Sequence, residues 1–255
     1  MTTPEFPTTA AELALEVETG TGGLRVDLAR RLVAEALGTG LLVLAVVGSG
    51  IMAERLSPDD VGLQLLENAA ATAGALVGLI LMFGALSGAH FNPVVTLIDR
   101  LFGALSTKEA LGYCVAQIGG GCVGSVVANV TFELDPVTLS TKVRSSSALW
   151  LSEVIATVGL LLVIHGCVRS GRSAAVPFAV GAWIGGACWF TSSTSFANPA
   201  VTIARTLTDT FAGIAPSSAP MVTAMQVVGA LVAFGLIRFL FPRVAQAAPS
   251  VSNDV

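Results

Sequence analysis

Charged residues are scarce in this chain. Asp, Glu, Lys and Arg make up 12% of its 255 residues, against about 25% in an ordinary soluble domain. Hydrophobic residues make up 53%, and the mean hydropathy is +0.79. This composition argues against a soluble enzyme. The formal net charge of -4 is small and gives no reason to expect a nucleic-acid partner.

Cysteine and histidine are also few. The sequence has four cysteines and two histidines, no Cys-x-x-Cys pair, and no histidine at ligand spacing from a cysteine. Such a pattern indicates neither a disulfide framework nor a metal site. No nucleophile–base set and no cofactor motif is present, so we expect no catalysis and no cofactor. The cysteines all lie in apolar segments, where we expect them to pack: Cys114, Cys122, Cys167 and Cys188.

Residues 1–27 lack the basic start and apolar core of a cleaved signal peptide. We interpret them, and residues 244–255, as polar tails flanking one membrane domain over 28–243. A membrane-spanning helix needs about 20 apolar residues. Six segments of this kind occur, at about 28–53, 65–85, 108–130, 148–168, 174–190 and 218–241.

The basic residues predict the orientation of these six spans, because cytoplasmic loops carry an excess of Lys and Arg. With the N-terminus inside, nine basic residues fall on the inner side: Arg25, Arg30, Arg31, Arg100, Lys108, Arg169, Arg172, Arg238 and Arg243. Four fall on the outer side: Arg55, Lys142, Arg144 and Arg205. We therefore expect a multi-pass protein of the inner (cell) membrane with both termini in the cytoplasm.

The chain contains an internal repeat. Glu35-Ala-Leu-Gly-Thr in the first span is matched by Glu153-Val-Ile-Ala-Thr in the fourth. Three spans separate the two positions, and an odd number reverses the orientation. The halves, about 28–130 and 148–243, are therefore predicted to be inverted repeats, whose sites lie at the midplane of the membrane.

Each half also contains an Asn-Pro motif. The first is Ser-Gly-Ala-His-Phe-Asn-Pro-Val-Val-Thr at 87–96, and the second is Ser-Phe-Ala-Asn-Pro-Ala-Val-Thr at 195–202. Asn is a strong N-cap and Pro fits the first helical turn, so Asn92 and Asn198 each predict an abrupt helix start. A helix that starts inside a membrane leaves unpaired N–H groups there, which requires a water-filled path. The fold class is thus all-α: six spans and two re-entrant half-helices.

These motifs, with the paired Glu-x-x-x-Thr, resemble the aquaporin or major intrinsic protein family over about residues 28–243. The resemblance implies one pore in each chain, which conducts small neutral solutes and water through the lipid bilayer, and a homotetramer. It places the two Asn-Pro motifs at the midplane of the pore: Asn92, Pro93, Val94, Asn198, Pro199 and Ala200. Two helix N-termini, each equivalent to roughly half a positive charge, would there repel cations.

The loop just before each Asn is expected to line the path with backbone carbonyls, at Gly88, Ala89, His90, Thr194, Ser195 and Phe196. Glu35 and Glu153 are interpreted as acceptors for the N–H groups of these loops, with a proton relay as the alternative. His90 resembles a loop-packing position of the family. His165 is interpreted as a core histidine with satisfied hydrogen bonds, and Cys188 is close enough to Asn198 in sequence to reach the pore.

The outer constriction departs from the family pattern. Family members commonly have Arg three residues after the second Asn, where this chain has Val201. Ungapped counting places Thr72, Gly186 and Ser195 beside it, which predicts a wide, uncharged selectivity filter. Arg205 lies one helical turn beyond Val201; it either attracts anions or is a solvated charge at a helix end, and we prefer the second interpretation.

The change from Arg to Val resembles bacterial aquaporins associated with arsenic resistance. We therefore expect a passive channel for neutral metalloid hydroxides such as arsenous acid and for glycerol-like polyols, with water as a further permeant. The alternatives are a water-selective or general glycerol channel and, as a different class, a proton-coupled transporter that uses Glu35 and Glu153.

Overall fold

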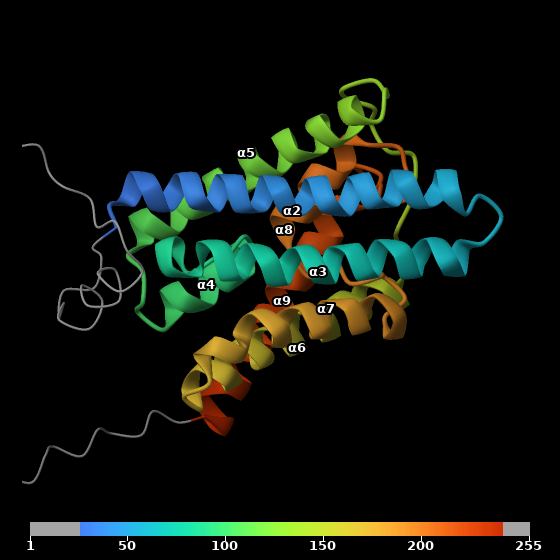
Figure 1. Ribbon diagram of the computed structural model, residues 1–255. Helices are drawn as coiled ribbons and strands as arrows, with labels where there is room; N and C mark the ends of the chain where they lie inside the picture. Colours follow the sequence, from blue (N-terminus) through green and yellow to red (C-terminus); the bar gives the residue numbers. More distant parts are fainter. Residues whose placement is uncertain (1–25, 242–255) are drawn as a thin grey trace, which may run out of the picture.

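The structure, a computed structural model, describes residues 26–241 (Figure 1). The two predicted tails therefore lie outside the described residues, except for Val26 and Asp27. Asp27 caps the first helix, because its side chain accepts a hydrogen bond from the backbone N–H of Arg30.

Six long helices are apolar enough to cross a membrane, which confirms the six predicted spans. They are α2 (Leu28–Leu56), α3 (Val61–Ser87), α5 (Thr107–Thr131), α6 (Ser147–Arg169), α7 (Val176–Phe190) and α9 (Ala219–Leu240). The shorter helices are α4 (Pro93–Leu101), α8 (Pro199–Ala204), η1 (Ser173–Ala175) and η2 (Arg205–Leu207). The described part of the chain contains no β-strand. The protein is therefore an all-α, multi-pass membrane protein.

The helices form a bundle with two distinct ends (Figure 1). We call the end where α2 begins and α9 finishes the terminal end. The opposite end, which carries the α2–α3 turn and the connection from α5 to α6, we call the loop end. The α4 half-helix runs from the interior toward the terminal end, and α8 runs from the interior toward the loop end.

The two halves are built alike and interlock. In the first half α2 packs against α3 and α5, and in the second half α6 packs against α7 and α9. Across the halves α3 packs against α7, α8 against α5, and α4 against α9. Each half-helix thus contacts the last long helix of the other half, so neither half completes its interior alone.

Small residues allow the closest helix contact, between α2 and α5. A Cβ atom added at Gly120 would overlap the backbone of Ala36, and one added at Gly124 would overlap the backbone of Gly40. In a membrane, helix association depends on such close packing, because lipid tails are as apolar as the side chains.

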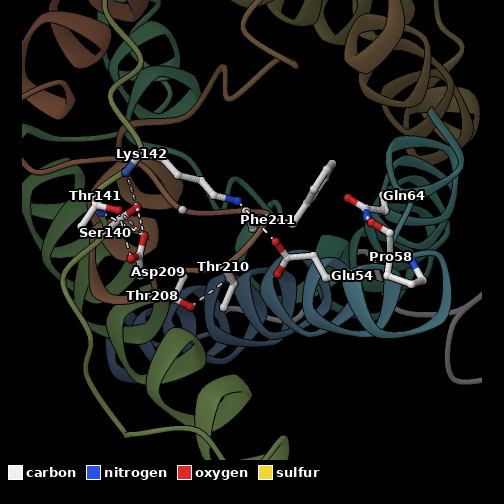
Figure 2. Close-up of polar contacts among 12 residues, drawn as sticks. Glu54, Pro58, Gln64, Ser140, Thr141, Lys142, Thr208, Asp209, Thr210 and Phe211 are labelled. Atoms are coloured by element: carbon white, nitrogen blue, oxygen red, sulfur yellow. Dashed lines mark hydrogen bonds and ion pairs between the residues drawn. The ribbon is translucent and has the colours of Figure 1, made fainter. Parts of the chain in front are cut away.

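The connecting loop, residues 132–146, lies over the loop end and is bonded to residues 206–215 of the second half. Figure 2 shows its polar contacts: Asp209 accepts hydrogen bonds from the backbone N–H of Thr141, at 2.9 Å, and from the Ser140 hydroxyl, at 3.3 Å. Lys142 reaches Glu54 of α2 with an N–O distance of 3.4 Å. The loop that joins the two halves also covers one end of the bundle.

Candidate functional site

Both half-helices begin at the predicted residues. Pro93 and Pro199 occupy the first turn, and each preceding Asn caps its own helix. Asn92 Oδ1 accepts the N–H of Val94 at 3.0 Å, and Asn198 Oδ1 accepts the N–H of Ala200 at 3.0 Å. The capping expected from the two Asn-Pro motifs is therefore present in the structure.

The two Asn side chains also join the half-helices to each other. Asn92 Nδ2 donates to the carbonyl of Ala197 at 2.8 Å, and Asn198 Nδ2 donates to the carbonyl of Phe91 at 2.8 Å. Each amide thus bonds the residue just before the other Asn. The reciprocal pair holds the two helix starts together inside the bundle and leaves one N–H of each amide without a partner in the described chain.

The loops before the Asn residues adopt an unusual backbone conformation in both halves. Ala89 and Phe91 have φ of 49° and 49°, and the equivalent Ser195 and Ala197 have φ of 53° and 47°. The left-handed region costs a non-glycine residue about 1–2 kcal/mol. Such strain persists only where the surroundings fix it.

Two fully buried carboxylates fix the loops. Glu35 accepts the backbone N–H groups of His90, at 3.0 Å, and Phe91, at 2.7 Å. Glu153 accepts those of Phe196, at 3.0 Å, and Ala197, at 2.9 Å. These contacts are the ones expected of loop-supporting carboxylates.

Sequence reasoning missed a third layer of this support. Gln117 Nε2 donates to Glu35 at 2.7 Å and to Thr96 Oγ1 at 3.0 Å. Gln226 repeats both contacts in the other half, with Glu153 at 2.7 Å and with Thr202 at 3.0 Å. A signal was available, since each Gln is a polar amide near the middle of the apolar third span of its repeat.

A cavity of about 680 Å³ passes both Asn residues. Its lining extends from Asp99 and Ala104, toward the terminal end, to Asn68 and Arg205, toward the loop end. The six residues expected to present carbonyls all line it: Gly88, Ala89, His90, Thr194, Ser195 and Phe196. Within residues 26–241 their carbonyl oxygens have no hydrogen-bond partner. Pro93, Val94, Pro199 and Ala200 do not line the cavity; Val94 and Ala200 are buried in the packing around it.

Three of the four residues expected at the constriction line the cavity, namely Thr72, Ser195 and Val201. The placement of Gly186 was wrong, because this residue is exposed on the outside of α7 and does not line the cavity. Ile184 and Cys188 of the same helix line it instead. Ungapped counting failed because it fixes neither where α7 ends nor which of its faces is turned inward.

The interpretation of Arg205 as a solvated charge was also wrong. Its relative exposure is 6%, and it lines the cavity. The guanidinium carbon lies 3.7 Å from the centre of the Phe196 ring, and Nε donates to the carbonyl of Ala212. The segment after η2 folds back over Arg205, which removes it from bulk water. The wall of the cavity is therefore not free of charge.

A polar cluster lies toward the terminal end of the cavity. His90 Nε2 is 2.9 Å from Asp99 Oδ2, and His165 Nε2 is 3.7 Å from Asp99 Oδ1. At that distance His165 Nε2 has no hydrogen bond within the described residues, so the interpretation of His165 as fully satisfied was wrong. Residues 26–241 hold no group of three or more His, Cys, Asp and Glu side chains placed to bind a metal.

Comparison with known proteins agrees with this architecture. Residues 24–195 match the family model "Major intrinsic protein". The chain is 48% identical over 230 residues to "Aquaglyceroporin AqpS" of Rhizobium meliloti (strain 1021), covering 89% of this chain and 98% of that protein. It is 29% identical over 157 residues to "Probable aquaporin NIP-type" of Nicotiana alata, covering 58% of this chain and 54% of that protein.

The fold is also similar to a solved structure. The X-ray structure of the aquaglyceroporin from Plasmodium falciparum aligns with a TM-score of 0.65 at 21% sequence identity, covering 83% of this chain and 96% of that one. At this identity the likeness concerns the fold alone.

Proposed function

The chain belongs to the major intrinsic protein family, and from this premise we propose that its cavity is a passive pore for small neutral solutes whose filter passes molecules larger than water. Relatives in the family support a passive channel for solutes and water. The observation that carries the proposal is the cavity itself, which runs past Asn92 and Asn198 between two tracks of unpaired backbone carbonyls. A row of acceptors facing apolar side chains suits a file of hydroxylated molecules.

The solute class follows from the groups at the constriction. Thr72 and Ser195 each have a buried hydroxyl without a hydrogen-bond partner in the described chain, and Val201 adds an apolar wall. Hydroxyl groups both donate and accept hydrogen bonds, so they match solutes that carry several hydroxyls. We propose polyols such as glycerol and neutral metalloid hydroxides such as arsenous acid, with water as a further permeant.

The position of Glu35 and Glu153 bears on the proton-coupled alternative. Both carboxylates are fully buried, accept hydrogen bonds from the loops, and do not line the cavity. A proton relay needs carboxylates that reach the transport path. This observation favours passive flux over coupled transport.

The proposal extends to the orientation and assembly of the protein. The bias of basic residues supports placing the terminal end in the cytoplasm, with the chain in the inner membrane. We also propose one pore in each chain of a homotetramer, as the family resemblance implies, and native mass spectrometry tests that number.

The first prediction concerns the permeants. In proteoliposomes, stopped-flow light scattering should show water, glycerol and arsenous acid crossing at rates well above those of empty vesicles. A passive channel predicts that protonophores leave the initial rates unchanged. A glycerol flux that collapses with the proton gradient would instead support coupled transport, and a flux of water alone would support the water-selective alternative.

A further inference from the structure

The guanidinium of Arg205 has few partners for a buried charge. Nε donates to the carbonyl of Ala212, but within residues 26–241 the two terminal nitrogens have no hydrogen-bond partner. No carboxylate of the described chain forms a salt bridge with it. A buried cation normally pairs with an anion. Arg205 has no such partner in the described chain, so no neighbouring anion offsets its charge, and its terminal donors stay free beside the cavity.

Arg205 is held firmly in this place. Its side chain stacks on Phe196, and its own backbone carbonyl accepts the N–H of Ile214 at 3.3 Å. Arg144 of the connecting loop lies 5.4 Å from the centre of the same ring and donates to the carbonyls of Gly213 and Phe211. These contacts keep the stacked Arg205 side chain at the loop end, buried from bulk solvent.

The charge stands at one end of a path whose backbone carbonyls attract cations. Among the described residues lining the cavity, Arg205 is the only Lys or Arg, and the single carboxylate, Asp99, lies toward the other end beside two histidines. Unpaired carbonyls line the stretch between them, and rings of carbonyls are what stabilise dehydrated cations in cation channels. The two half-helix N-termini oppose this attraction at the midplane, and Arg205 adds a positive charge at the loop end.

We propose that Arg205 excludes cations at the loop end of this pore, in addition to the helix N-termini at its midplane, and orients oxygen-rich neutral solutes there, a role that rests on the proposed channel function. Its terminal N–H groups donate to solute oxygens that have shed water, while its charge repels sodium, potassium and hydronium ions. The group acts from the position one helical turn beyond Val201, where it stacks on the Phe196 ring.

The test replaces the charge and measures two fluxes in the same proteoliposomes. Arg205→Gln removes the charge, and Arg205→Lys keeps it. Potassium influx is read with an ion-sensitive dye, and glycerol influx by light scattering. We expect the ratio of potassium to glycerol permeability to rise at least tenfold in Arg205→Gln and to stay near the wild-type ratio in Arg205→Lys.

Arg144→Gln is the matched control, because Arg144 packs on the same Phe196 ring without lining the cavity. We expect it to retain potassium exclusion. If potassium enters through Arg144→Gln as fast as through Arg205→Gln, the influx comes from a disturbed loop and the proposal is overturned. Potassium exclusion that survives in Arg205→Gln would overturn it as well.

A second pair of variants keeps Arg205 in place, in case its replacement prevents folding. Val201→Glu sets a carboxylate one turn away, where it neutralises the guanidinium, and Val201→Gln adds similar bulk without charge. We expect potassium to leak through Val201→Glu more than through Val201→Gln, and equal exclusion by both would refute the role. If the wild-type protein conducts no glycerol, the proposed function itself is refuted. If glycerol flux is intact and the variants still exclude potassium, only the role of Arg205 is refuted.

Discussion

The side chains at the centre of this cavity differ in their contacts from those at its loop end. At the centre, Asn92 and Asn198 are each fixed by two hydrogen bonds, one to their own half-helix and one to the opposite loop. Toward the loop end, Val201 and Arg205 place an apolar and a cationic group on successive turns. We therefore propose that selection at this end depends on the size of residue 201 and on the charge of residue 205.

Val201→Arg is expected to lower glycerol permeability at least ten times more than water permeability. The longer side chain fills the cavity wall and adds a second guanidinium one turn from Arg205, so larger solutes lose both space and the apolar contact. Stopped-flow measurements on the same vesicles give both rates. Val201→Ala should instead raise the ratio of glycerol to water permeability. If Val201→Arg lowers both permeabilities equally, the constriction lies elsewhere.

At the scale of elements, the half-helices exist only because the rest of the bundle supports them. With 9 and 6 residues, α4 and α8 are shorter than the roughly 12–15 residues at which isolated helices become marginally stable. Each is stabilised by its Asn cap, by a buried Glu that is bonded to a Gln, and by contact with a long helix of each half. The Glu–Gln pairs are Glu35–Gln117 and Glu153–Gln226. The loops can stay strained because each is bonded to a buried Glu of its own half and to the Asn of the other half-helix.

Close packing of α2 on α5 gives a prediction at the same scale. Gly124→Ala should lower the unfolding temperature in detergent by several degrees, because the new methyl group meets the backbone of Gly40, and overpacking typically costs about 1–3 kcal/mol. Gly119→Ala is the control: nothing lies within 4 Å of its Cβ position, and Ala in a helix is favoured over Gly by about 0.5–1 kcal/mol. Equal shifts in the two variants would contradict this packing.

At the scale of the whole molecule, the cavity belongs to neither half alone. Its wall takes one carbonyl track and one Asn from each repeat, and the connecting loop closes the assembly at the loop end. Hydrogen bonds from Thr141 and Ser140 lower the pKa of the Asp209 carboxyl, the backbone N–H of Thr141 being the largest cause. A lowered pKa means that the charged form stabilises this contact: the contribution is complete above the unfolded pKa and is lost as the pH falls through the lower, folded value.

Asp209→Asn is therefore expected to loosen the connecting loop at neutral pH, as acid would in the wild-type protein. Hydrogen exchange of the segment 137–146 should become faster, while the half-helices exchange as before. Asp135→Asn is the control, since this exposed carboxylate of the same loop has no hydrogen bond within the described chain. Equal exchange in the Asp209 and Asp135 variants would show that the contact does not hold the loop.

The sequence by itself determined the elements that depend on local chemistry. Apolar length defined the six spans, Asn before Pro defined the start of each half-helix, and the repeated Glu-x-x-x-Thr pointed to the carboxylates that hold the loops. Only the tertiary structure decided which residues share a wall. The packing of α7 against α3 and α6 turned Gly186 outward and Cys188 inward, and the fold of residues 208–218 buried Arg205. These outcomes depend on contacts between distant segments, which no spacing along the chain encodes.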